Sequence, residues 1–285
     1  MSSETDEATG GPTIAPGETG GGERGFGTDV WVNFKRWNLK AVRNPFVLTA
    51  SLIQPIVFLV LFTQVFGQVA TGAISRGGTS ITYESFLLPA IVIQVSLVAA
   101  ATSGIGLVND IEEGMFEKVL VSPMNRAAVF LGKTLAEMLR ITVQILIILG
   151  LGVLLGANVV TGVAGALAIV AIGIVFAGWF TAFSNVVALV TRDQESTIIG
   201  ANILQFPLLF VSSAFLPVEL LPDWIQVISD FNPVTYGVDA ARALVIDGWV
   251  WETILPNVAV LVGLDLVLGA FAVYMLNRAS SSEVQ

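Results

Sequence analysis

This sequence of 285 residues contains no cysteine and no histidine. The missing cysteine excludes a disulfide framework, an iron–sulfur cluster and a cysteine nucleophile. The missing histidine removes the most frequent general base and the most frequent metal ligand in proteins. Together these absences exclude most of the hydrolytic and metal chemistry that an enzyme could carry out.

Charge is scarce as well, because only 12% of the residues are Asp, Glu, Lys or Arg, against about a quarter in water-soluble proteins. Hydrophobic residues make up 54%, and the mean hydropathy is +0.81. So little charge cannot cover a soluble surface, and the composition therefore predicts an integral membrane protein. The net charge of −9 disfavours a nucleic-acid partner. A high-salt cell interior favours an acidic, lysine-poor protein surface, because salt screens its self-repulsion, so we expect a prokaryotic and halophilic source.

Six windows of the sequence are apolar and long enough to cross a hydrocarbon core of about 30 Å as helices. Residues 141–191 contain no charge and would extend about 76 Å as one helix, so the chain must turn once, near residues 156–162. The fold class is therefore predicted to be all-α, with six transmembrane helices inside residues 45–278. The predicted spans are 46–66, 86–108, 139–158, 163–190, 196–216 and 254–276.

An even number of spans places both termini on the same side of the membrane. Eleven lysines and arginines lie on that side, and only Arg76 and Arg242 lie on the other. Because positive residues concentrate on the cytoplasmic side, both termini are predicted to be cytoplasmic in a multi-pass protein of the plasma membrane. The first apolar stretch begins after residue 45, so no cleavable signal peptide is expected.

The segments before the first span differ in character. Residues 1–27 are acidic and rich in glycine, and residues 279–285 form a short polar tail, so neither can bury enough apolar surface to fold. Residues 28–44 predict an amphipathic connecting helix along the membrane surface, with an ordinary juxtamembrane anchor as the alternative. Its candidate functional residues are Phe34, Lys35, Arg36, Trp37 and Lys40.

Residues 109–126, between the second and third spans, are the most charged part of the chain. Met115, Phe116, Val119 and Leu120 follow helical spacing, and Pro123 ends the short helix that this spacing predicts. A short helix with an apolar face and an acidic flank suits docking into a groove of another protein. The alternative is a solvated loop helix that folds against its own bundle.

Residues 127–134 end in Gly132-Lys133-Thr134, as a nucleotide-binding P-loop does. The P-loop pattern requires glycine where this chain has Ala127, and no strand precedes the segment. The chain is therefore not expected to bind ATP itself.

Residues 217–248, before the last span, contain two short amphipathic pieces, each opened by a proline. They are too short to span the membrane and too apolar to stay in water, so interfacial or re-entrant helices are predicted.

Several polar side chains fall inside the predicted spans. An acid at the depth of Asp265 should face protein or water and is a functional candidate, or it is protonated and bonded to an amide such as Asn202 or Gln205. Amides in spans usually join helices to one another. Glu137 and Arg140, three residues apart, are predicted to form a local ion pair. The intramembrane candidates are Asp265, Gln54, Gln94, Asn202 and Gln205.

The run E-E-G-M-F-E-K-V-L-V-S-P-M-N-R at residues 112–126 resembles the cytoplasmic loop of type-2 ABC transporter permeases, which usually reads E-x-G-T-x-E-x-L-x-x-x-P. Met115 stands where threonine is usual, and Val119 where leucine is usual. The runs F-L-P-V-E-L-L-P-D-W-I-Q and N-P-V-T-Y-G-V-D-A-A-R resemble the region before the last span of that family. The resemblance covers about residues 28–278 and is closest to the drug-resistance and polysaccharide-export branch, which includes daunorubicin-resistance membrane subunits.

The resemblance implies a permease subunit of an ABC exporter that moves a drug-like, lipid or polysaccharide substrate outward. Such a subunit is not an enzyme and holds no cofactor, because a separate ATPase subunit on the cytoplasmic side binds ATP and Mg. It pairs with a second copy or with a similar permease. A non-transporting membrane scaffold and an intramembrane enzyme are the alternatives. The residues expected to couple to the ATPase are Glu112, Glu113, Gly114, Met115, Phe116, Glu117, Val119, Leu120 and Pro123.

Overall fold

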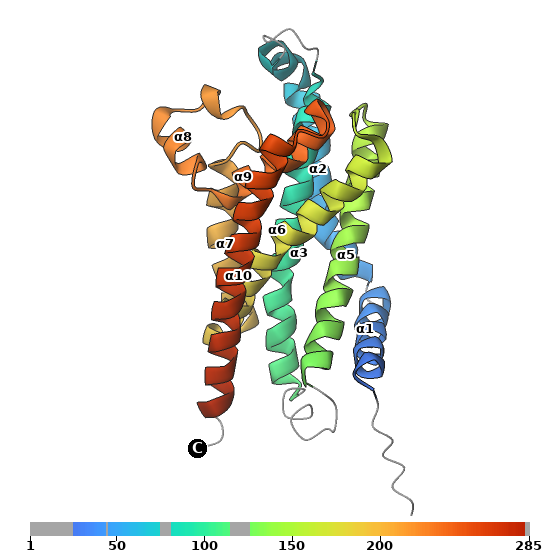
Figure 1. The fold of residues 1–285 in the computed structure, drawn as a ribbon, viewed down its shortest axis with the longest axis vertical. Coiled ribbons are helices and arrows are strands. Elements are labelled where there is room, and N and C mark those ends of the chain that lie inside the picture. Colours follow the sequence, from blue (N-terminus) through green and yellow to red (C-terminus); the bar gives the residue numbers. More distant parts are fainter. Residues whose placement is uncertain (1–24, 44, 75–80, 115–125, 283–285) are drawn as a thin grey trace, which may run out of the picture.

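The computed structural model describes residues 25–43, 45–74, 81–114 and 126–282, and within them all regular structure is helical. The predicted all-α membrane protein is confirmed. Figure 1 shows the long helices running along one axis of the molecule. They are α1 (Phe26–Arg43), α2 (Pro45–Ile74), α3 (Tyr83–Glu112), α5 (Arg126–Leu154), α6 (Gly162–Thr191), α7 (Gln194–Phe210) and α10 (Trp251–Ser282).

Local signals in the sequence set several of these helix ends. Thr82 caps α3 by accepting a hydrogen bond from the Ser85 amide at 3.4 Å. Asp193 caps α7 by accepting one from the Ser196 amide at 2.8 Å. The predicted turn between the third and fourth spans lies between α5 and α6, where Gly156 and Gly162 have φ angles of 107° and 61°.

Five described helices, α2, α3, α5, α6 and α10, are long and apolar enough to cross a membrane. The fifth predicted span, residues 196–216, differs, because α7 has 17 residues and ends at Phe210. Its length is about 25 Å, short of a hydrocarbon core of about 30 Å. The described residues therefore hold five clear candidate spans, and a total of six remains a prediction.

Helix α3 is the centre of the bundle, packed against α2, α5, α6 and α7. Its most apolar stretch is 72% buried, whereas that of α10 is only 6% buried. The core includes Leu87 and Ile91 of α3 and Phe176 and Phe180 of α6, all fully buried. Helix α10 packs along α6 and leaves most of its own apolar surface uncovered.

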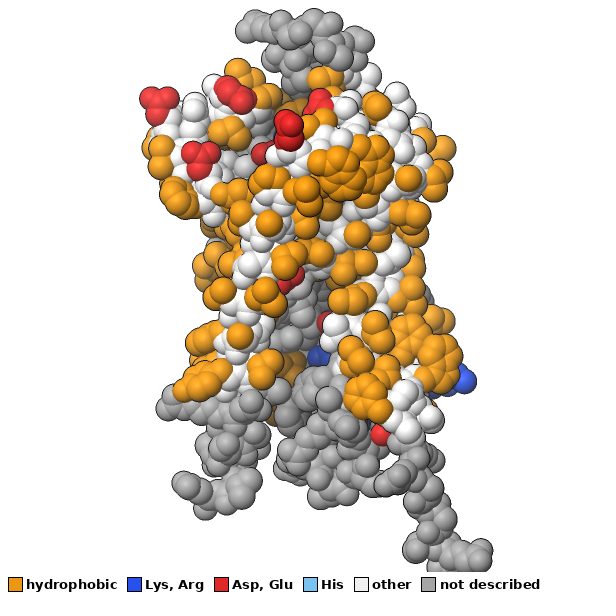
Figure 2. Space-filling model, in the orientation of Figure 1, with side chains coloured by type: hydrophobic (Ala, Val, Ile, Leu, Met, Phe, Trp, Pro, Cys, Tyr) orange, Lys and Arg blue, Asp and Glu red, His pale blue; other side chains and the backbone are white. Residues whose placement is uncertain are grey.

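The two ends of the molecule differ in composition. The start of α1 and the end of α10 lie at the same end of the bundle, which we call the α1 end. The opposite end carries α8 (Asp223–Ser229), α9 (Pro233–Arg242), the 3-10 helix η2 (Val218–Leu220) and the π-helix η3 (Ala243–Asp247). Figure 2 shows hydrophobic side chains over the middle of the molecule and a group of acidic side chains near α8.

Candidate functional site

Helix α1, which contains the predicted connecting helix, packs lengthwise against α5. The contact is close because α5 presents Gly132, where an added Cβ would lie 2.7 Å from the Val30 carbonyl oxygen and 2.7 Å from the Asn33 Cβ. Asp29 and Asn33 are buried in this contact, and Asn33 donates to the Asp29 carbonyl at 2.8 Å. The Gly-Lys-Thr sequence at Gly132 thus lies in a helix and serves helix packing.

The Trp37 indole lies among cationic side chains at the α1 end. Lys40 Nζ and Lys133 Nζ each lie 5.3 Å from the ring centroid, and the Arg36 guanidinium carbon lies 5.9 Å from it. Cations at this distance are attracted by the negative face of the ring. Of the five predicted residues of the connecting helix, Arg36, Trp37 and Lys40 meet here, whereas Lys35 is exposed and Phe34 stacks on Trp31.

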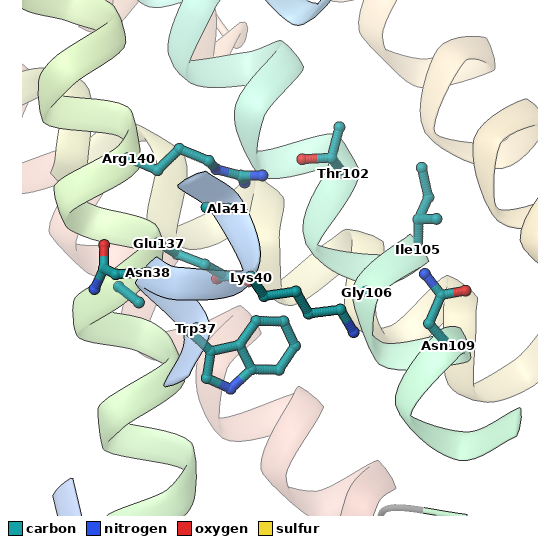
Figure 3. Close-up of a pocket in the computed structure, with 11 residues that line it drawn as sticks. Trp37, Asn38, Lys40, Ala41, Thr102, Ile105, Gly106, Asn109, Glu137 and Arg140 are labelled. Carbon is teal, nitrogen blue, oxygen red and sulfur yellow. The ribbon is translucent and has the colours of Figure 1, made fainter. Parts of the chain in front are cut away.

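A cavity of about 290 Å³ lies between α1, α3 and α5 (Figure 3). Glu137 and Arg140 of α5 line it, but the predicted ion pair between them is wrong. Glu137 accepts a hydrogen bond from Ser103 of α3 at 2.9 Å, and Arg140 donates to the Ala99 carbonyl at 3.0 Å. Both side chains therefore join α5 to α3. The cavity is lined by Trp37, Asn38, Lys40, Ala41, Thr102, Ile105, Gly106, Asn109, Ala136, Glu137 and Arg140.

The predicted coupling segment begins at the end of α3, beside this cavity. Glu113 forms an ion pair with Lys40 of α1 at 3.8 Å, and Glu112 accepts a hydrogen bond from Gln194 of α7 at 2.8 Å. Gly114 follows with a φ of 64°. The start of the segment thus contacts both α1 and α7. Met115, Phe116, Glu117, Val119, Leu120 and Pro123 lie outside the described residues.

The intramembrane candidates do not gather into one site. Asp265 faces α6, where an added Cβ on Gly178 would lie 2.7 Å from its Oδ1, so its predicted partner on α7 is wrong. Gln94 is fully buried, and neither polar atom of its amide has a hydrogen-bond partner. Gln205 is buried, Gln54 is half-buried and Asn202 is exposed.

An arginine network at the opposite end was not anticipated from the sequence. Arg242 donates to the Ser213 carbonyl at 2.8 Å and pairs with Asp239 at 3.3 Å, while its guanidinium carbon lies 3.8 Å from the Phe86 ring centroid. Burial lowers the pKa of Arg242 to about 10, so the side chain stays protonated at neutral pH. Burial also raises the pKa of Asp239, an effect that Arg242 opposes. The available signal in the sequence was the spacing of Asp239 and Arg242, three residues apart in a short amphipathic helix.

This network explains why α7 stops inside an apolar sequence. Beyond Phe210 the backbone leaves the helix, and its carbonyl groups need partners away from water. Asn232 donates to the carbonyls of Leu208 and Val211, and Arg242 donates to those of Ser213 and Ala214. The segment before the last span thus supplies hydrogen-bond donors to the carbonyl groups at the end of α7.

Comparison with known proteins agrees with this architecture. A profile of the ABC-2 type transporter family matches residues 28–246. The daunorubicin resistance ABC transporter permease protein DrrB1 of Streptomyces coeruleorubidus is 31% identical over 203 residues, which are 70% of this chain and 69% of that protein. The probable doxorubicin resistance ABC transporter permease protein DrrC of Mycobacterium tuberculosis is 24% identical over 273 residues, 95% of each chain. The putative transport permease ycf38 of Cyanophora paradoxa is 29% identical over 220 residues, 77% of this chain and 74% of that protein.

The profile extends from the connecting helix to the segment before the last span, and the resemblance to type-2 ABC permeases of the drug-resistance branch is confirmed. The apolar helices of the structure agree with such a protein. This chain is a multi-pass membrane permease of the ABC-2 type transporter family.

Proposed function

We propose that this permease exports a hydrophobic or amphipathic compound, driven by ATP that a separate ATPase subunit hydrolyses. The observation that carries the proposal is the family match over residues 28–246, which includes both the connecting helix and the predicted coupling loop 109–126. Relatives named for daunorubicin and doxorubicin resistance favour a drug-like substrate. The ATPase binds ATP and Mg, and two permease chains pair to form the path.

The contacts at the end of α3 suggest how the ATPase acts on the bundle. A force on the coupling loop reaches α1 through Glu113 and Lys40, and reaches α7 through Glu112 and Gln194. The ion pair itself contributes less than about 1 kcal/mol, because both side chains are more than half exposed. Helix α1 in turn packs closely on α5 at Gly132, so a movement of α1 would also move α5.

The docking role of the coupling loop is tested by reversing the charge of one loop residue and replacing an apolar loop residue with a charged one. Glu113→Lys combined with Met115→Asp replaces an acid and an apolar residue, so we expect loss of the ATPase from pull-downs while the permease still inserts into the membrane. Leu220→Asp combined with Asp223→Lys makes similar changes at the opposite end and should leave the pull-down unchanged. Normal recovery of the ATPase by the loop variant would refute docking at this loop.

The orientation of the chain is part of the same proposal. The Lys/Arg bias supports an orientation in the plasma membrane with the α1 end in the cytoplasm and α8 outside. The acidic, lysine-poor composition supports a prokaryotic, halophilic source. Because the chain has no cysteine, single cysteines can be introduced at positions 118 and 223 and probed with a membrane-impermeant thiol reagent. In sealed cells the reagent should label position 223 only. Labelling at position 118 would show that the chain has the opposite orientation.

A further inference from the structure

The cavity between α1, α3 and α5 contains polar groups that the protein itself does not satisfy. The Nε atom of Arg140 is buried and has no hydrogen-bond partner, and neither has the buried Nε1 atom of Trp37. Both side chains line the cavity, and Figure 3 shows Arg140 extending from α5 toward α3. The Trp37 nitrogen is turned away from the other lining residues, whereas Arg140 is held on the cavity wall by its bond to the Ala99 carbonyl. A buried donor without a partner costs about 1–3 kcal/mol, and an acceptor beside the Arg140 guanidinium can offset part of that cost.

The charges around the cavity favour an anion. Lys40 and Arg140 are the cations in its lining, Glu137 is the carboxylate, and Glu137 already accepts a hydrogen bond from Ser103. The lining therefore carries one excess positive charge, which a singly charged phosphodiester would neutralise. Lys133 and Arg36, near Trp37, add positive charge close by, whereas Asp110 and Glu113 oppose it.

We propose that this cavity binds the phosphate headgroup of a phospholipid from the leaflet at the α1 end. Arg140 and Lys40 contact the phosphate oxygens, and the lipid fixes α1 against α3 and α5. The proposal does not depend on the exported substrate or on the ATPase.

Two features favour a lipid over free phosphate. The cavity walls are partly apolar, with Ile105, Ala41 and Ala136 among the lining residues. Helix α1 exposes Trp31 and Val42, which are 63% and 75% accessible, as a helix lying in a membrane interface does. Pockets that hold drug-sized ligands measure about 300–1,000 Å³. This cavity of about 290 Å³ lies at the small end of that range, which suits a phosphate headgroup whose acyl chains stay outside.

The test uses the full chain, delipidated in a neutral detergent, with native mass spectrometry to count bound lipid and thermal unfolding to measure stabilisation. Phosphatidylglycerol should bind and raise the midpoint of unfolding, whereas diacylglycerol, which lacks the phosphate, and inorganic phosphate should do neither. Lys40→Gln and Arg140→Gln should each weaken phosphatidylglycerol binding at least about tenfold, the equivalent of one lost charge-assisted hydrogen bond. Lys35→Gln, which removes the same charge from the same helix outside the cavity, should bind normally.

Each contrary result has a defined meaning. Equal stabilisation by diacylglycerol, or equal loss in Lys35→Gln and Lys40→Gln, would overturn a phosphate site in this cavity. If inorganic phosphate alone stabilised the protein, and Lys40→Gln abolished this effect, the ligand of the cavity would be a soluble anion and not a lipid. Since Lys40 is exposed at the surface, its variant should fold even where Arg140→Gln does not. Recovery of the ATPase in pull-downs tests the export proposal, and lipid binding is measured separately on chains that keep Glu113 and Met115.

Discussion

Replacing Gly132 with alanine tests whether close backbone contact holds α1 on α5. A Cβ at this position would lie 2.7 Å from the Val30 carbonyl oxygen and 3.0 Å from the Phe34 amide nitrogen. Both are backbone atoms, which cannot rotate away as a side chain can. Helix α1 must therefore move away from α5 to accommodate the methyl group.

The expected size follows from two opposing effects. Forcing an extra methyl group into a packed contact costs about 1–3 kcal/mol. Alanine in place of glycine inside a helix gains about 1 kcal/mol. Gly150 lies in the same helix with no other atom within 4 Å of an added Cβ, so Gly150→Ala should show the gain alone. We therefore expect Gly132→Ala to be less stable than Gly150→Ala by about 1–3 kcal/mol.

Two measurements check this expectation. Thermal unfolding in detergent should give a lower midpoint for Gly132→Ala than for Gly150→Ala. Nitroxide labels at the exposed positions 35 and 139, on α1 and α5, should show a longer or broader distance distribution in Gly132→Ala only. If Gly132→Ala keeps the distance distribution and is stabilised as much as Gly150→Ala, backbone contact at Gly132 does not hold α1.

Three further predictions concern other contacts. Arg242→Gln removes one partner of a largely buried ion pair and should lower the free energy of unfolding by about 3 kcal/mol. Arg242→Lys should recover only part of this stability, because lysine lacks the guanidinium fork. Equal unfolding midpoints for the wild type and Arg242→Gln would contradict this expectation. Gly178→Ala should push the Asp265 carboxylate away from α6 and lower the unfolding midpoint. Gly263→Ala, which adds its methyl group in open space on α10, should leave the midpoint unchanged. Similar midpoints for the two variants would show that α10 adjusts freely. The Ser196 amide lowers the pKa of Asp193 below its ordinary 3.8, so the cap contributes fully above pH 3.8 and is lost as the pH falls through the lower folded-state value. Hydrogen exchange of the backbone amides at the start of α7, corrected for intrinsic rates, should therefore become faster in acid for the wild type and stay unchanged in Asp193→Asn. A parallel increase in both proteins would show that the Asp193 carboxylate is not the cause.

The amino-acid sequence alone predicts a membrane protein and indicates the approximate positions of the long apolar helices in the described residues. Hydropathy is a sum over neighbouring residues, so windows such as 86–108 and 163–190 identify α3 and α6 without any knowledge of packing. Capping is equally local, because Asp193 and Ser196 are three residues apart. The loop motif at residues 112–126, together with the runs before the last span, also indicated the family, because short runs of residues carry both signals.

Which faces of these helices meet is visible only in the folded structure. The sequence offers Asn202 and Gln205 as examples of partners for Asp265, but the rotation of α10 directs the Asp265 carboxylate to Gly178 of α6. Helix α7 ends at Phe210 in an apolar sequence because Asn232 and Arg242, distant in the chain, supply donors for the freed carbonyls. Contacts of this kind depend on how whole helices are rotated and how closely they approach one another. A count of apolar residues along one segment gives no information on either.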